Sequence, residues 1–460
     1  MNRTLKEWST ATSGVLRQGD PGASTHGVSI DTRTLKPSDL FFALKGPRFD
    51  AHDYLDDAVK AGAAALVVHR LPAGWTPPSA LGVIEVPDTL AALQAAARQH
   101  RAVIRATLVG ITGSNGKTTT KEMLAAILSR RGKTLATAGN YNNHIGLPLT
   151  LLRLDPDHRY GVIEMGTSMP GDMDLLADLT RPEAGLITNV GQDHLEFFGT
   201  PEGVLKENWK LYERLAGDGF AVLNIDDPLL APKATSLSCH VIRYSTQQPA
   251  DVYAKDIRPW PWPMRFTLVI GGKSYPAELP VIGPLQVLNA VAAAAVATGL
   301  NVPPEQIIAG LAEFKPAAMR MQVTTHPSGA VLVNDAYNAN PSSVQLAVES
   351  FCASFPQTPR WAVLGDMREL GDTARAAHRE LGRWLATQPL DRLYLYGRDS
   401  RFIEEGVREK KPSTLKVERY RKKSLLGKAV AGSLITERPA ILFKASRRMR
   451  LETLIQELMR

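Results

Sequence analysis

Short apolar runs alternate with helical patterns along most of this chain. Near the N-terminus, apolar runs at 39–44 and 63–68 flank a helical pattern at 54–61, and an alanine-rich helix follows at 89–98. The later runs are continuous and apolar with helical segments between them, which is typical of strands buried in parallel sheets. These later runs lie at 106–111, 161–164, 185–189, 221–225, 330–335, 361–365, 392–396 and 440–443.

The spacing of these runs divides the chain into three parts. At about 150 residues per domain, a length of 460 residues also favours three domains. We expect an α/β protein with a small N-terminal α/β domain at 1–100, a central doubly wound parallel sheet at 101–318, and a C-terminal Rossmann-like α/β domain at 319–460. Residues 260–272 run from a Trp-Pro-Trp-Pro segment through alternating residues to a Gly-Gly turn, which predicts an antiparallel hairpin added to the central domain.

The composition limits where the protein works. With 44% hydrophobic and 22% charged residues, the chain is an ordinary globular protein rather than a disordered or fibrous one. Its apolar stretches are shorter than the roughly 18–20 residues of a membrane span. The N-terminus lacks the apolar core of a secretion signal. We therefore expect a cytoplasmic protein without a membrane span.

The net charge and the cysteine content indicate which binding partners and which cysteine chemistry to expect. The formal net charge is +8, but the basic runs at 419–423 and 447–450 lack RNA-binding aromatics and zinc-finger spacing. We expect no nucleic-acid partner and attribute the charge to a solvated face or to attraction of small anionic substrates. Cys239 and Cys352 are too few for a disulfide framework or a thiolate zinc cluster. We expect both thiols to be buried or without a special role. Separately, we expect the protein to be a monomer.

A glycine-rich segment at 107–120 predicts a phosphate-binding loop (P-loop) between a strand and a helix. Gly113 and Gly116 allow backbone N–H groups to turn inward, Lys117 reaches the outer phosphates, and Thr118 suits Mg²⁺. The general G-x-x-x-x-G-K-[ST] pattern has a glycine where this chain has Ile111, and the spacing also differs from dinucleotide-binding loops. ATP is favoured over NAD. The predicted nucleotide-contacting residues of the loop are Thr112, Gly113, Ser114, Asn115, Gly116, Lys117, Thr118 and Thr119.

Glu164 closes the predicted strand at 161–164, at the sheet edge where ligands bind in open α/β folds. A carboxylate there suits Mg²⁺, although from the residues alone a solvated strand-end acid is an equal alternative. His194 follows the next strand, but from the residues alone a single loop histidine is more often an ordinary residue than a metal ligand. Other histidines, such as His378, lack such a context, and we expect them at the surface.

Four segments together resemble the Mur ligase family of ATP-dependent amide-bond-forming enzymes. The loop at 112–118 matches the family's T-G-x-N-G-K-T throughout, and similar strings lie at 139–148 (GNYNNHIGLP), 333–341 (VNDAYNANP) and 364–371 (LGDMRELG). The similarity runs from about Ser29 to the C-terminus. It is greatest to the branch of the family that joins D-alanyl-D-alanine (D-Ala-D-Ala) to UDP-MurNAc-tripeptide in peptidoglycan synthesis.

The resemblance implies a mechanism and assigns residues to it. A substrate carboxylate attacks the ATP γ-phosphate, and the acyl phosphate that forms is displaced by an amine. By resemblance, the catalytic residues are Lys117, Glu164, His194 and Arg320, and the Mg²⁺ ligands are Thr118, Glu164 and His194. Asn289 and Asp335 would contact the nucleotide. The substrate residues would be Asp31, Thr32, Arg33, Asn140, Asn142, Asn143, Tyr337, Asn338, Ser446 and Arg447.

One position departs from the family pattern. A lysine that becomes carbamylated and bridges a second Mg²⁺ normally lies fourteen residues after the histidine, where this chain has Asn208. Lys206 and Lys210 would point to other faces of the helix. We hypothesise that the Asn208 amide or water replaces the carbamate, with weaker affinity for a second metal. A related amide ligase with another acceptor, and a non-catalytic ATP-binding cell-wall partner, remain alternatives.

Overall fold

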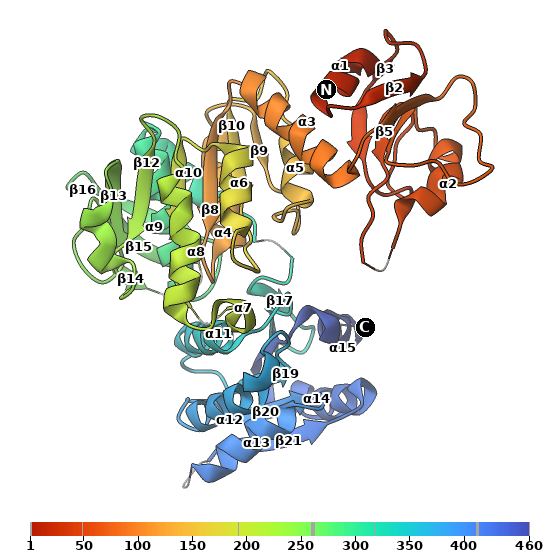
Figure 1. Ribbon diagram of the computed structural model, residues 1–460. Helices are drawn as coiled ribbons and strands as arrows, with labels where there is room; N and C mark the ends of the chain where they lie inside the picture. The colour runs from red at the N-terminus through yellow and green to blue at the C-terminus, as the bar shows by residue number, and fades with distance from the viewer. Residues whose placement is uncertain are drawn as a thin grey trace.

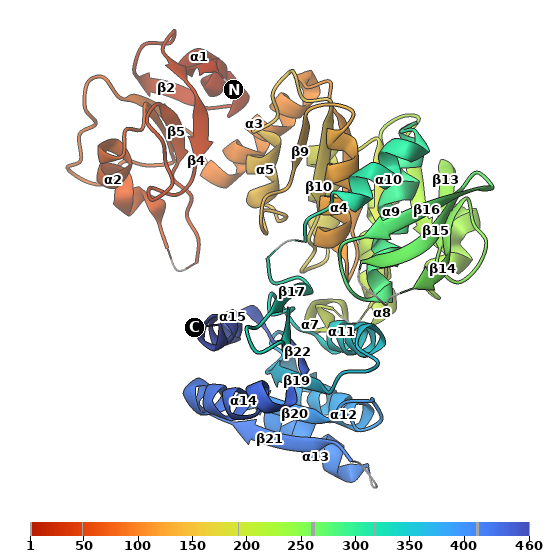
Figure 2. The same ribbon diagram turned by 180° about the vertical axis from the view of Figure 1, so that it is seen from behind.

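The computed structural model describes residues 2–47, 49–191, 193–258, 263–316, 318–410 and 414–459. Three α/β units follow one another along the chain (Figure 1). Seen from both sides, the N-terminal and C-terminal units each lie beside the central unit (Figure 2). The mixed α/β architecture with largely parallel sheets confirms the predicted fold class.

The N-terminal unit is built on a sheet with the strand order β2-β7-β6-β5-β4, in which β2 is antiparallel to β7 and the remaining neighbours are parallel. The predicted apolar runs form β5 and β6, and the predicted helix is α2. The elements are β1 (Arg3–Thr4), α1 (Leu5–Ala11), β2 (Val15–Gln18), β3 (Ser24–Thr25), β4 (Gly27–Ser29), β5 (Asp39–Phe42), η1 (Ala51–Tyr54), α2 (Leu55–Lys60), β6 (Ala65–Val68), β7 (Gly82–Glu85) and α3 (Thr89–Val103).

Helix α3 belongs to two units at once. Its buried side chains, including Leu93 and Ala97, share one apolar cluster with Trp8 of α1 and with Leu147 and Leu176 of the central unit. Asp88 caps the helix by accepting hydrogen bonds from the backbone of residues 90 and 91. The predicted domain boundary at residue 100 therefore falls within one continuous helix.

The central unit holds the largest sheet, with the strand order β16-β15-β14-β13-β12-β11-β8-β10-β9. The strands from β9 to β14 are parallel, and β14, β15 and β16 pair antiparallel. The elements are β8 (Thr107–Thr112), α4 (Lys117–Ser129), β9 (Thr134–Ala136), α5 (Gly146–Leu151), β10 (Tyr160–Glu164), α6 (Asp172–Thr180), β11 (Ala184–Ile187), α7 (Leu195–Phe198), α8 (Pro201–Glu213), β12 (Phe220–Asn224), η2 (Ala231–Ser236), β13 (His240–Ser245), β14 (Val252–Arg258), β15 (Met264–Ile270), β16 (Lys273–Leu279), α9 (Pro284–Gly299) and α10 (Pro304–Ala312).

The order of the central strands fixes where a ligand can bind. The connection that leaves β8 leads to β9 at one edge of the sheet, whereas the connection that leaves its neighbour β11 leads to β12 on the other side. A crevice therefore opens at the carboxyl ends of these two strands. Successive residues of β8 face opposite layers: Val109 packs in the cluster with α4 and α9, whereas Leu108 packs in the cluster with α5 and α6. The predicted hairpin is β15–β16. Residues 259–262 of its Trp-Pro segment lie outside the described residues.

The C-terminal unit repeats the parallel plan with the order β17-β18-β22-β19-β20-β21, in which β17 is the antiparallel member. Its elements are β17 (Gln322–Thr325), β18 (Val331–Asn334), α11 (Pro341–Ser354), β19 (Arg360–Gly365), η3 (Gly371–Thr373), α12 (Ala374–Leu385), β20 (Arg392–Tyr396), α13 (Ser400–Glu409), β21 (Lys416–Tyr420), α14 (Lys423–Glu437), β22 (Ala440–Lys444), η4 (Arg447–Met449) and α15 (Glu452–Leu458).

The prediction that His378 lies at the surface is wrong. The side chain is fully buried, and its Nε2 accepts a hydrogen bond from the Met367 backbone at 3.0 Å while Nδ1 donates to the Ala374 carbonyl at 2.7 Å. The ring thus satisfies two backbone groups where β19 turns toward α12, a role that a lone histidine does not reveal in sequence.

Among the described helices, none is both long and apolar enough to cross a bilayer.

Candidate functional site

A cavity of about 300 Å³ opens at the carboxyl ends of the central strands. The central unit lines it with the P-loop, the segment after β9, the end of β10 and the segment before α7, and the C-terminal unit closes the other side. It brings together the predicted site residues Ser114, Asn115, Gly116, Lys117, Thr118, Thr119, Asn140, Asn142, Asn143, Glu164, His194, Arg320, Tyr337 and Asn338.

The P-loop has the backbone shape that its glycines predict. Gly113 (φ 121°) and Gly116 (φ 83°) adopt conformations that L side chains rarely take. α4 starts directly after Gly116 with no side-chain cap, so its amide end faces the cavity. The Lys117 ammonium folds back and donates to the carbonyls of Gly113 and Ser114. The loop is therefore shaped to receive an anion that would draw Lys117 outward.

The segment after β11, residues 188–193, makes hydrogen bonds to the P-loop. The Asn189 side chain accepts from the Asn115 backbone N–H at 2.9 Å, and the Thr188 hydroxyl donates to the Asn115 carbonyl at 2.6 Å. Ser114 donates to the Asp193 carboxylate and accepts from the Gly191 N–H. These hydrogen bonds connect the P-loop to the segment after β11.

Glu164 lines the cavity with one carboxylate oxygen that makes no hydrogen bond to the described residues. Its Oε1 accepts from the Asn142 amide at 2.8 Å, and its backbone N–H donates to Thr137 Oγ1 at 2.9 Å. Its Oε2 is buried and has no hydrogen-bond partner among the described residues. A buried carboxylate oxygen without a hydrogen bond is costly, and a bound cation closer than the Lys121 ammonium, which lies 3.9 Å away, would offset that cost. Together with Thr118 and His194, which line the same cavity, this donor set fits Mg²⁺.

A fully buried lysine, which the sequence did not single out, lies beside this carboxylate. Lys121 Nζ is 3.9 Å from Glu164 Oε2, donates to the Thr137 carbonyl at 2.6 Å and pairs with Glu122 at 2.8 Å. Its position on α4, one turn after Lys117, was the available signal. Lys121 ties the P-loop helix to the strand-end segment that supports Glu164.

Asn208 is a hydrogen-bonding residue of the site's floor. It is 1% exposed, and its Oδ1 accepts from the hydroxyls of Thr112 at 3.0 Å and Thr167 at 3.3 Å. Lys210 instead pairs with Asp174 and Glu207, each at 2.7 Å, and Lys206 is exposed. Neither lysine takes the position of the family's carbamylated residue.

A second, smaller cavity of about 60 Å³ adjoins the first. Asn289 and Asp335, both predicted to contact nucleotide, line it. Asn289 Nδ2 donates to the Gln286 side chain at 3.1 Å. Arg320 lines both cavities, and its guanidinium lies 4.1 Å from the ring centroid of Tyr337. The two cavities therefore share a wall at the junction of the central and C-terminal units.

The predicted residues of the N-terminal unit lie elsewhere. Asp31 lines a separate cavity of about 330 Å³ between the end of β4 and α5, whereas Thr32 and Arg33 do not line it. The Arg33 side chain is 85% exposed and pairs with Asp31 at 2.6 Å, which lowers the pKa of Asp31 to about 2. Tyr141 borders this cavity, and its neighbour Asn140 borders the P-loop cavity, so one loop separates the two.

Ser446 and Arg447 do not line the P-loop cavity in this structure. The Ser446 hydroxyl accepts from the Arg368 backbone at 2.8 Å, and the Arg447 guanidinium pairs with Glu452 at 2.6 Å. Lys444, two residues earlier, lines both the P-loop cavity and the smaller one. Thr112 and Gly113 also lie behind the cavity wall, where Thr112 contacts Asn208.

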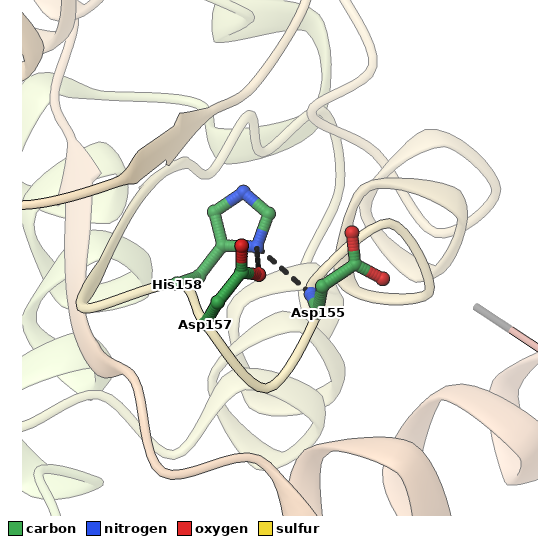
Figure 3. Close-up of side chains that lie close together, drawn as sticks. All are labelled: Asp155, Asp157 and His158. Carbon is green, nitrogen blue, oxygen red and sulfur yellow. Dashed lines mark hydrogen bonds and ion pairs between the residues drawn. The ribbon is translucent and has the colours of Figure 1, made fainter.

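A cluster of side chains of the kinds that bind metals lies away from the P-loop cavity (Figure 3), and one of its members, Asp155, borders the cavity that Asp31 lines. Potential ligand atoms of Asp155, Asp157 and His158 lie within 4.8 Å of one another. His158 Nδ1 accepts from the Asp155 backbone N–H at 2.8 Å, and Lys133 pairs with Asp157 at 2.8 Å. The hydrogen bond therefore closes a turn at residues 155–158, and Lys133 neutralises the charge of Asp157, so the cluster needs no metal ion to explain it.

The fold and the cavity define a class: an α/β protein whose P-loop, at the switch point of a doubly wound sheet, is built to bind a nucleoside polyphosphate beside a metal-type carboxylate. The chain belongs to the Mur ligase family. Three models of that family match it: "Mur ligase family, catalytic domain" at residues 24–101, "Mur ligase middle domain" at 111–297, and "Mur ligase, glutamate ligase domain" at 319–447.

Individual relatives match nearly the whole chain. The UDP-N-acetylmuramoyl-tripeptide–D-alanyl-D-alanine ligase of Bacillus subtilis is 36% identical over 460 residues, covering 100% of this chain and 98% of that protein. A crystal structure of MurF from Acinetobacter baumannii superposes with a TM-score of 0.90 at 31% identity, covering 100% and 99% of the two chains. MurF from Thermotoga maritima in complex with ADP gives a TM-score of 0.82 at 28% identity, covering 95% and 97%.

Proposed function

We propose that this protein is an ATP-dependent ligase that joins D-Ala-D-Ala to UDP-MurNAc-tripeptide in peptidoglycan precursor synthesis. The observation that carries the proposal is the arrangement of one cavity. Lys117 and the amide end of α4 face Glu164 there, and Arg320, Tyr337 and the C-terminal unit form the opposite wall. The relatives reported above, at 28–36% identity over almost the full chain, support the same activity and substrates for this protein.

The nucleotide site follows from the two adjoining cavities. The P-loop and Lys117 would hold the phosphates of ATP, and Asn289 and Asp335 would contact the nucleoside in the smaller cavity. Thr118, Glu164 and His194 would hold Mg²⁺, which supplies neutralisation of phosphate charge.

The first step of the reaction requires the carboxylate of the muropeptide next to the γ-phosphate of ATP. The cavity bordered by Asp31 and Tyr141 would receive the UDP end of the muropeptide, and Asn140, Asn142 and Asn143 would guide the peptide toward the P-loop. Attack of the peptide carboxylate on the γ-phosphate releases ADP and leaves an acyl phosphate. The amine of D-Ala-D-Ala then displaces phosphate, and the wall from the C-terminal unit excludes water from the acyl phosphate.

Several finer assignments belong to the same proposal. We place the reaction in the cytoplasm, where ATP is available, and propose a monomer. We keep the division at 1–100, 101–318 and 319–460 as the muropeptide, ATP and acceptor domains. Thr32, Arg33, Ser446 and Arg447 contact substrate in this proposal only after the units move, because none of them lines the three cavities described above.

The test is release of phosphate from ATP by the purified protein with Mg²⁺. Release that requires both UDP-MurNAc-tripeptide and D-Ala-D-Ala supports the proposal. Lys117→Ala is expected to abolish it, while the matched control Lys206→Ala, an exposed lysine of the same unit, retains it. Release with a different amino-acid acceptor would indicate a related amide ligase, and ATP binding without release would indicate a non-catalytic protein.

A further inference from the structure

Lys444 is a buried cation on the wall shared by the two nucleotide cavities. It is the last residue of β22, and its side chain is 3% exposed. The adjacent parallel strand β18 ends at Asn334, so the next residue, Asp335, lies beside Lys444 at the carboxyl edge of the sheet. The Asp335 side chain is 9% exposed.

The Lys444 ammonium joins three segments of the C-terminal unit. Nζ donates to Asp335 Oδ2 at 2.5 Å and to the Asn338 carbonyl at 3.0 Å. The other oxygen of Asp335 accepts from the Met321 backbone N–H at 3.2 Å. The residue before Met321 is Arg320, which stacks on Tyr337. One ion pair therefore holds β22, the turn at 335–338 and the segment that carries Arg320.

Stability alone does not account for such a pair. Removing two charges from water costs free energy that their attraction often fails to repay, and apolar residues of the same size would serve a core equally well. Burial lowers the pKa of Lys444, while Asp335 opposes that shift. What the pair provides is a fixed direction for Asp335 and for the turn that carries Tyr337 and Asn338. Those residues form the wall that a nucleotide would meet.

We propose that Lys444 is a positioning residue for nucleotide binding, which acts by holding Asp335 and the turn at 335–338 in the orientation that receives ATP. The inference rests on the proposed function, since it assumes that ATP occupies the two adjoining cavities. It assigns a role to a residue two positions before Ser446 and Arg447, which were the predicted substrate residues of this segment. A role through Asp335 predicts that the effects of changing the two residues overlap.

A double-mutant cycle measures that overlap. Mg²⁺-ADP binding is measured by titration calorimetry for the full chain, for Lys444→Met, for Asp335→Asn and for the double variant. Each single change is expected to weaken ADP binding by about tenfold, and the double variant no more than the stronger single one. The KM for ATP should rise by the same factor as the Kd. Lys428→Met, at an exposed lysine of the same unit, is the matched control and should leave both constants unchanged.

Two results would overturn the proposal. Unchanged ADP affinity in Lys444→Met would show that the pair is only structural, and losses that multiply to about a hundredfold in the double variant would show that Lys444 acts independently of Asp335. If Lys444→Met fails to fold, the ADP affinities of Asp335→Asn and of the double variant are compared instead, because the double variant buries no unpaired charge. Equal affinities support the proposal, and a further loss in the double variant contradicts it. A wild-type protein that binds ADP but joins no substrates would refute the proposed function. The double-mutant cycle could still be measured in that case, because it needs only ADP binding.

Discussion

Replacing Asn208 with alanine tests the floor of the site. The change removes the acceptor of two buried hydroxyls, Thr112 at 3.0 Å and Thr167 at 3.3 Å. A typical hydrogen bond contributes about 0.5–1.5 kcal/mol, and a buried group left without a partner costs about 1–3 kcal/mol. We expect a loss of about 2 kcal/mol in the central unit. For a unit of this size that corresponds to a fall in melting temperature of about 4–8 °C.

Differential scanning calorimetry is the assay, because a chain of three units need not unfold in one step. The transition of the central unit is identified as the one that Mg²⁺-ADP raises, since a ligand stabilises the unit that binds it. Lys206→Ala, two residues away and exposed, is the matched control and should shift the transition by no more than about 1 °C. An Asn208→Ala protein that melts like this control would refute the hydrogen-bonding role assigned to Asn208.

Three further outcomes follow from the same geometry. Turnover should not depend on added bicarbonate, because no lysine takes the place of Asn208; a carbamate found by carbon-13 labelling on either neighbouring lysine would contradict this. Glu164→Gln should raise the Mg²⁺ concentration for half-maximal turnover by roughly tenfold or more, since the ligand loses its charge; an unchanged Mg²⁺ titration would count against Glu164 as the ligand. Burial raises the pKa of Cys352 to about 11, so at neutral pH a thiol reagent should label Cys239 rapidly and Cys352 only after unfolding; equal labelling rates in the native protein would show that the burial is wrong.

The sequence predicted the elements that position the site. Continuous apolar runs became β8, β10, β11 and β12, because a strand covered on both faces has no polar position to interrupt it. Gly113 and Gly116 predicted positive φ angles in the loop before α4, and both residues have them. The strand-end position of Glu164 then placed a carboxylate at the edge where ligands bind.

Pairing between distant buried charges was not predictable. Nothing in the sequence indicated that Lys121 is buried with its ammonium donating to the Thr137 carbonyl, or that Lys444 pairs with Asp335. The strands β13 and β14 were also missed, since they mix exposed and buried positions without a continuous apolar run. Periodicity reports local burial, whereas these features depend on which segments the fold brings together.

The charges around the P-loop cavity bear on the substitution at Asn208. Among the described residues that line it, Lys117, Arg320 and Lys444 are cationic, and Glu164 and Asp193 are the carboxylates. Asp193 already accepts a hydrogen bond from the P-loop, whereas Glu164 keeps one oxygen without a hydrogen bond, 3.9 Å from the Lys121 ammonium. A neutral amide in place of a carbamate leaves no anion at that position to hold a second cation. The protein's own cations must then balance more of the triphosphate charge, and we expect a site that depends on one bound Mg²⁺ and on these side chains rather than on a second metal.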